Sequence, residues 1–230
     1  MRLSLLLLFA VGAAAAQPVP VLTDTTAPRY GSGAAAAVHL TEYGFGVGGL
    51  YRARLSADYS FLVEARLGAG KDEREQAFFV GLFGETVVPF KRNYVLLLPL
   101  HVGVERRLFR EAIEDNFRPY VQATAGPTFA YQWPYFRDED GSGTREEGEE
   151  RLNPWAGLGD GEGRVGVGGT LAVGAWLGRG RQSAQGVRFG FSGSYFFREV
   201  ELLEEDPEVE DPSRRFFGTP VVSFHFLRLR

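Results

Sequence analysis

The segment from Tyr59 to Gly70 alternates regularly enough to fix its secondary structure. Apolar side chains occupy one parity, while serine, charged residues and glycine occupy the other, with Leu62 as the exception. A period of two is typical of a β-strand with one apolar and one polar face. In a water-soluble sheet the apolar face would pack on a core. In a membrane barrel it would meet lipid, and the charged face would line the lumen.

Residues 1–16 have the layout of a secretory signal peptide. They carry an early charge at Arg2, an apolar run and three alanines before Gln17, where cleavage is expected. Residues 17–42, which include three prolines, are predicted to form an extended leader. No later run approaches the about 18 apolar residues of a membrane-spanning helix, and the chain has no cysteine. We therefore expect an exported protein that is held together without disulfides.

Residues 43–230 contain the strand at 59–70 and seven more segments of similar length. Each exceeds the about 9–11 residues that a tilted strand needs to cross a bilayer. An even number of strands lets the first pair with the last and leaves no open edge. The predicted fold is therefore all-β, an eight-stranded antiparallel up-and-down transmembrane β-barrel. Its strands are 43–55, 59–70, 77–88, 94–107, 119–131, 164–177, 186–198 and 215–229.

The connections between these strands differ in length. Two long polar loops, 132–163 and 199–214, fall on one side of the predicted barrel, and short turns at 71–76 and 179–185 fall on the other. Long outer loops and short periplasmic turns are typical of outer-membrane barrels. The very short turn at 56–58 and the longer connection at 108–118 depart from this rule.

The polar parity of the predicted strands carries arginine and glutamate residues that would face the lumen. Such a lining would be unfavourable in a soluble barrel with an apolar ligand. In a narrow membrane barrel, guanidinium and carboxylate groups can satisfy each other, and glycines on the same parity leave space for them. The predicted lumen charge network consists of Arg52, Arg54, Glu64, Arg66, Glu85, Glu105, Arg107 and Arg188.

Aromatic residues gather near the predicted strand ends, where membrane barrels carry aromatic girdles. They are Tyr43, Tyr59, Tyr94, Tyr131, Trp133, Tyr195 and Phe197. With this pattern, the chain from 43 to 230 resembles the small outer-membrane β-barrel proteins of Gram-negative bacteria, in the broad sense of OmpA/OmpX-like barrels.

The resemblance implies an outer-membrane location and contacts with membrane lipid and lipopolysaccharide. It also implies recognition by the barrel insertion machinery, for which Phe224 and Phe226 can serve as an aromatic signal near the C-terminus. We expect a monomer. We expect no nucleic-acid partner, because the sequence carries no basic stripe.

One loop segment matches the spacing of a calcium-binding loop, with Gly143 at the position of the sharp turn. Arg145, however, stands where an apolar residue is usual. A solvated acidic loop is the simpler interpretation, and no cofactor other than calcium is expected. The candidate calcium ligands are Asp138, Asp140, Ser142, Glu146 and Glu149.

The sequence leaves more than one function open. The preferred hypothesis is a non-enzymatic outer-membrane barrel with a structural or surface-interaction role, in which the acidic outer loops meet partners. A lipid-modifying hydrolase is an alternative, because Ser223 and His225 share a strand face and His101 is a further candidate, yet these parities point toward the lumen. A narrow pore is another, although an eight-stranded barrel is usually filled by its side chains. The charged inner parity disfavours a soluble lipocalin-like carrier.

Overall fold

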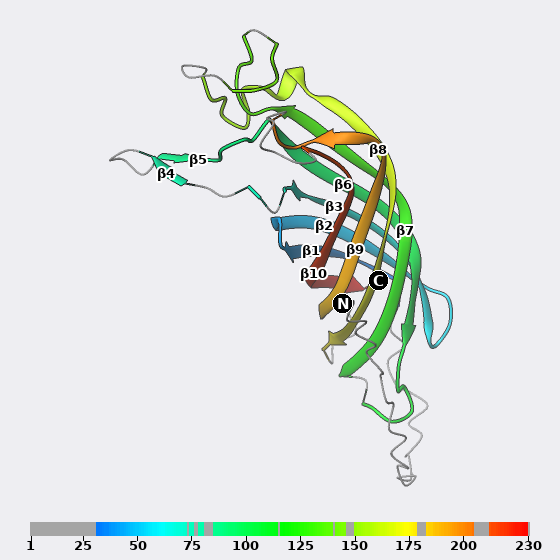
Figure 1. The fold of residues 1–230 in the computed structure, drawn as a ribbon. Helices are drawn as coiled ribbons and strands as arrows, with labels where there is room; N and C mark the ends of the chain where they lie inside the picture. The colour runs from blue at the N-terminus through cyan, green and yellow to red at the C-terminus, as the bar shows by residue number, and fades with distance from the viewer. Residues whose placement is uncertain are drawn as a thin grey trace, which may run out of the picture.

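Eight long strands close into one antiparallel barrel in the computed structural model (Figure 1). The first and last strands, β1 and β10, pair with each other, so the barrel has no open edge. This closure confirms the predicted fold class. The barrel strands are β1 (Gly33–Thr41), β2 (Gly44–Arg54), β3 (Tyr59–Gly70), β6 (Asn93–Arg107), β7 (Phe117–Pro134), β8 (Glu162–Leu177), β9 (Ser183–Glu201) and β10 (Ser213–Leu229). The structure describes residues 31–72, 74–75, 78–80, 85–114, 116–139, 141–145, 150–178, 183–204 and 212–229.

The outer wall of the barrel is apolar and its interior is polar. On β3, Tyr59, Phe61 and Val63 are exposed, whereas Glu64 and Arg66 are buried, as the alternation predicts. The same pattern continues around the wall in exposed leucine, valine and phenylalanine side chains. A continuous apolar belt of this kind is matched by the hydrocarbon of a bilayer, not by water. Among the described residues, no helix is long and apolar enough to cross a membrane.

Two predicted segments are wrong, although the count of eight barrel strands is right. Residues 33–41, assigned to the leader, form β1; four consecutive alanines give this strand little contrast between its faces. The predicted strand 77–88 is not part of the barrel. It contributes β4 (Phe78–Val80) and β5 (Glu85–Val87), which pair as a separate hairpin that projects sideways from the barrel in Figure 1. The predicted signal peptide, residues 1–16, lies outside the described residues.

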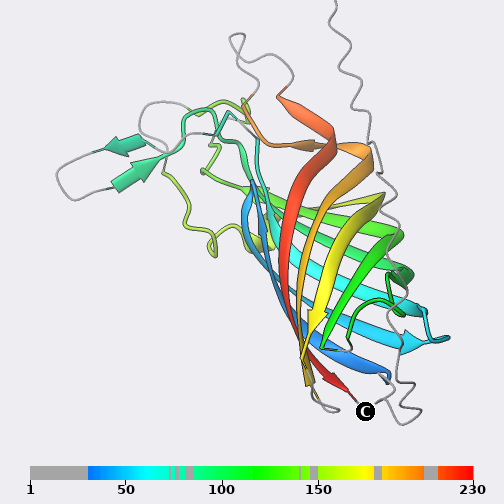
Figure 2. The ribbon, with the colours of Figure 1, turned by 90° about the horizontal axis from the view of Figure 1, so that it is seen from below.

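The additional strand β1 reverses the predicted direction of β2 and β3, whereas β6 and the strands after it keep their predicted direction because segment 77–88 is not a barrel strand. The short connections after β2, β6 and β8 lie at the barrel end that holds Gly33 and Leu229, and the long connections after β3, β7 and β9 lie at the opposite end (Figure 2). The turn at 56–58 is therefore an inner turn. Segment 71–76 begins a long outer loop, which corrects its predicted place on the inner side.

An arginine in the middle of the apolar belt tests whether the belt meets lipid. Leu171 on β8 points outward and is 70% exposed. In a bilayer, Leu171→Arg is expected to lower the free energy of unfolding by about 2–4 kcal/mol, and Leu177→Arg at the strand end by about 0–1 kcal/mol. Urea unfolding in lipid vesicles measures both. Equal and negligible effects would show that this wall faces water.

Candidate functional site

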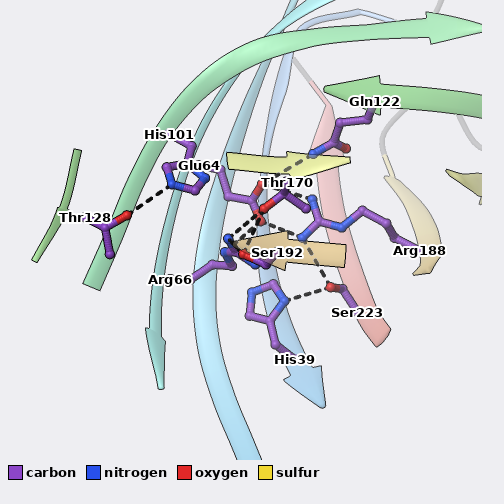
Figure 3. A network of polar contacts seen from close by, with 10 residues as sticks. All are labelled: His39, Glu64, Arg66, His101, Gln122, Thr128, Thr170, Arg188, Ser192 and Ser223. Atoms are coloured by element: carbon purple, nitrogen blue, oxygen red, sulfur yellow. Dashed lines mark hydrogen bonds and ion pairs between the residues drawn. The ribbon is translucent and has the colours of Figure 1, made fainter. Parts of the chain in front are cut away.

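Glu64 and Arg188 form an ion pair across the full width of the lumen (Figure 3). Glu64 lies on β3 and Arg188 on β9, which are four strands apart in either direction around the barrel. Two guanidinium nitrogens of Arg188 donate to the two carboxylate oxygens of Glu64, over 2.5 and 3.0 Å. Arg188 is 0% exposed and Glu64 2%. Bidentate pairing offsets more of the hydration that both charges lose than a single contact would.

Further polar groups complete the network around this pair (Figure 3). Gln122 on β7 donates to Oε2 of Glu64 over 3.3 Å, and Nε of Arg66 lies 3.6 Å from Oε1. Nη2 of Arg66 also donates to the hydroxyls of Thr170 and Ser192, each over 2.8 Å. The carboxylate of Glu64 therefore pairs with two arginines, and hydroxyls of β8 and β9 accept hydrogen bonds from the second one, Arg66.

Ser223 on β10 pairs with His39 on β1, and not with His225. Nδ1 of His39 lies 2.8 Å from Oγ of Ser223, which also accepts a hydrogen bond from Arg188 over 3.2 Å. The imidazole fits because residue 48 is glycine, since a Cβ there would come within 2.7 Å of Nε2 of His39. The serine and both histidines are buried, so this pair is enclosed within the lumen.

A second charge pair lies nearer the inner end of the barrel. Nε of Arg52 donates to Oε1 of Glu105 over 2.9 Å, and Nε1 of Trp176 donates to Oε2 over 2.8 Å. The Trp176 ring stacks on Tyr120, with centroids 5.8 Å apart. An apolar layer thus fills the inner end of the lumen. Its buried residues are Ala35, Leu50, Leu62, Tyr120, Trp176, Ala184 and Leu227.

The outer end of the lumen is filled by a second apolar layer. The chain that leaves β9 folds over it, because the backbone N–H of Arg92 donates to the carbonyl of Leu202 over 2.9 Å. The N–H of Glu204 donates to the carbonyl of Phe90 over 2.8 Å. The buried residues of this layer are Tyr43, Val95, Ala130, Phe196, Val200, Leu202, Leu203 and Phe217.

Buried carboxylates connect the outer loop after β3 to the barrel rim. Asp72 accepts from Arg74 and pairs with Arg214 of β10, each at 2.8 Å, and Glu75 pairs with Lys91. Burial alone would raise the pKa of Asp72. The hydrogen bonds from Arg74 and the charge of Arg214 nevertheless hold that pKa below its ordinary value.

The residues of the predicted charge network do not all lie in the lumen. Arg54 lies at the inner rim, where its Nε donates to the carbonyl of Ser56 over 2.9 Å. Arg107 is half-buried at the inner end of β6. The prediction for Glu85 is wrong, because this residue belongs to β5, outside the barrel. The lumen holds the other five, which are Arg52, Glu64, Arg66, Glu105 and Arg188.

Sequence reasoning missed several partners in the lumen. Gln122, Thr170 and Ser192 lie on the polar parity of their predicted strands, so the alternation could have identified them. His39 could not be found in this way, because its strand was assigned to the leader. His101, a candidate for hydrolysis, instead lies 3.4 Å from the hydroxyl of Thr128.

The predicted calcium loop is described only in part. The carboxylate oxygens of Asp138 accept hydrogen bonds from the N–H groups of Gly141 and Gly143, over 2.8 and 2.9 Å, and Ser142 bonds to the same turn. Across the described ranges, no three His, Cys, Asp or Glu side chains gather as a metal site. Calcium binding stays a prediction. Its other candidate ligands, outside the described residues, are Asp140, Glu146 and Glu149.

Comparison with known proteins yields similarity of structure alone. No protein-family model matches the chain, and no curated protein matches it significantly in sequence. Neisserial surface protein A is similar in structure, with 9% identity and a TM-score of 0.44 over 86% of this chain and 94% of that one. Ail, the attachment invasion locus protein of Yersinia pestis, has 11% identity and a TM-score of 0.34 over 86% and 93%.

CarO of Acinetobacter baumannii has 10% identity and a TM-score of 0.32, over 85% of this chain and 97% of its own. These three are small eight-stranded outer-membrane barrels. A likeness at this level does not show what the present chain binds or does.

Removal of the central carboxylate should destabilise the barrel. Glu64→Leu leaves Arg188 and Arg66 buried without their carboxylate, so we expect a loss of about 3–5 kcal/mol in the free energy of unfolding. Urea unfolding in detergent, followed by gel mobility, measures the loss.

Two variants control for this effect. Replacing both ends, as in Glu64→Leu with Arg188→Met, is expected to recover part of the loss, because fewer charges remain unpaired. Arg54→Met at the rim should change stability by no more than about 0.5 kcal/mol. A Glu64→Leu variant as stable as Arg54→Met would contradict a central role for the pair.

The contact of Asp72 with Arg214 should depend on pH. The pKa of Asp72 is lower in the folded chain than in the unfolded chain. The ionised carboxylate therefore stabilises the fold fully above the unfolded pKa, and this stabilisation is lost as pH falls through the folded pKa. Hydrogen exchange of residues 71–75, corrected for intrinsic rates, should accelerate in acid. Asp72→Asn should show the faster exchange already at neutral pH. An unchanged exchange rate in this variant would contradict a role of the Asp72–Arg214 ion pair in holding this loop to the barrel rim.

Proposed function

We propose that this chain is a closed, non-enzymatic barrel of the Gram-negative outer membrane, with a structural role or a role in contacts at the cell surface. The observation that carries the proposal is the filled lumen. A charge pair joins opposite walls at mid-height, and apolar layers occupy both ends. With eight strands, the interior is about as wide as the side chains that fill it.

This packing favours a closed barrel over the two alternatives. Ions in a pore would have to pass the Arg188–Glu64 pair and both apolar layers. A hydrolase would need a substrate carbonyl at Ser223, whose hydroxyl is 0% exposed and is already bound by His39 and Arg188. A reacting lipid would therefore have to enter the packed lumen.

The outer end offers charged groups for contacts at the surface. Glu199 pairs with Arg215 at 3.1 Å, and Glu201 with Arg92 at 3.4 Å, so part of the acidic sequence is already neutralised. Arg164 lies beside Glu162 and Glu201 in the same region. Mixed charges at this height suit lipopolysaccharide phosphates and the divalent cations that bridge them. We propose lipopolysaccharide as the surrounding lipid and the barrel insertion machinery as the partner during assembly.

The test combines location with conductance. The protein should remain in washed outer membranes and migrate differently on a gel with and without boiling. In planar bilayers it should give no discrete conductance steps, because the lumen is packed. Protein from the same preparation must keep its heat-dependent mobility, which shows that the barrel is folded. Discrete steps would support the pore, and recovery from the soluble periplasm would contradict the membrane location.

A further inference from the structure

Three aromatic side chains at the outer ends of β6 and β7 hold one loop segment against the outside of the barrel. The hydroxyl of Tyr94 donates to the carbonyl of Leu152 over 3.1 Å, and Nε1 of Trp133 donates to that of Pro154 over 2.8 Å. The hydroxyl of Tyr131 donates to the carbonyl of Leu158 over 2.5 Å. The Trp133 ring lies between the two tyrosine rings, with centroids 5.6 and 5.8 Å away.

These aromatic rings belong to the outward parity of their strands. On β7, Tyr131 and Trp133 continue the row that contains the exposed Val121 and Phe129, and Tyr94 pairs directly with Trp133 across the ladder. The segment they hold therefore lies on the lipid-facing side of the wall, just above the apolar belt. The sequence predicts one long polar loop over 132–163, and no pattern within it indicates this contact.

Trp155 is presented at the tip of this segment. It is 80% exposed, while its turn is fixed by Asn153, whose side-chain oxygen accepts the N–H groups of Trp155 and Ala156, each over 3.0 Å. Residues 152–159 contain no Lys, Arg, Asp or Glu. An exposed tryptophan on a fixed, uncharged turn leaves a large apolar surface in contact with water. The same amphipathic ring is stabilised at the boundary between headgroups and acyl chains.

We propose that the turn around Trp155 is an interfacial anchor, which inserts its indole ring into the outer leaflet of the membrane beside β7 and β8. The anchor rests on the membrane location proposed above. Its occupant is a lipid surface because the turn is fixed to the outer wall at the upper edge of the belt, where Phe129 of β7 and Val165 of β8 face outward. The anchor fixes the depth of this side of the barrel.

Spin labels can locate this turn, because the chain has no cysteine of its own. We would place a single cysteine at Trp155→Cys, at Val167→Cys in the apolar belt, and at Ser142→Cys in an exposed outer loop. Each variant carries a nitroxide in phosphatidylcholine–phosphatidylglycerol vesicles. Collisions with oxygen, which dissolves in lipid, are then compared with collisions with a water-soluble nickel complex.

The label at 155 is expected to collide with the nickel complex several-fold less often than the label at 142, and with oxygen more often. A label at 155 that behaves like the one at 142, while the label at 167 reads as lipid, would overturn the anchor and leave Trp155 free for a protein or sugar partner. If the label at 167 also collides with the nickel complex as often as the label at 142, this wall lies in water. The proposed membrane location is then wrong, and so is the proposed anchor.

Lipid quenching of native fluorescence gives an independent readout. Brominated lipids should quench the wild-type protein more than Trp155→Phe, because the other two tryptophans, Trp133 and Trp176, are buried. Equal quenching of the two proteins would overturn the proposal. Heat-dependent gel mobility shows whether each variant is folded.

Discussion

The width of an eight-stranded barrel governs most of this structure. Long side chains from opposite walls can meet only if the ring is narrow, and Arg188 reaches Glu64 across the whole diameter. Once they meet, both charges are buried, with Arg188 0% and Glu64 2% exposed, and burial without polar partners would be costly. Several polar groups near the pair find a partner on another strand. Gln122 and Ser223 do so at mid-height, and Trp176 does so with Glu105 nearer the inner end. Among the described residues, however, both ring nitrogens of His225 have no hydrogen-bond partner.

A buried ion pair is weak evidence for stability, because lost hydration offsets much of the attraction between its charges. Its clearer effect here is on which face of each strand turns inward. The outer wall of the barrel faces lipid. An apolar strand face therefore gains little free energy by turning from the lipid to the lumen. A charged face cannot remain in lipid, and a shift in register by one residue would place Glu64 and Arg66 there. The charged parity thus specifies the orientation of the wall.

The same reasoning explains which parts of the fold could be predicted. Strands with charge on one parity, such as β3 and β9, were found with correct faces, because alternation is the direct mark of a wall between lipid and lumen. Strand β1 was missed since its alanines are alike on both faces. Segment 77–88 was included wrongly, because length and apolarity suggested a strand that lacked a polar face.

Within the site, parity could indicate which charges point inward but not which partners they meet. Glu64 and Arg188 were expected in one network, yet their direct pairing depends on strand order and stagger around the ring. The pairing of Ser223 with His39 depends on the closure of β1 on β10, and so could not be predicted once β1 was assigned to the leader. The outer segment at 152–158 was missed for another reason. Side chains of the barrel wall donate hydrogen bonds to the backbone carbonyls of this segment, and because every residue has a backbone carbonyl, the sequence does not show which ones are bound.

The closure of β1 on β10 also bears on how the barrel assembles. His39 and Ser223 are 184 residues apart in the chain, and Glu64 and Arg188 are 124 apart. Contacts of such long range form only after most of the loop entropy has been lost, so they belong to the late steps of folding. Until β10 arrives, the arginines and glutamates of the inner face would lie open along an unfinished sheet, and they could not enter hydrocarbon in that state. Ring closure and entry into the membrane therefore have to occur together, as one cooperative event.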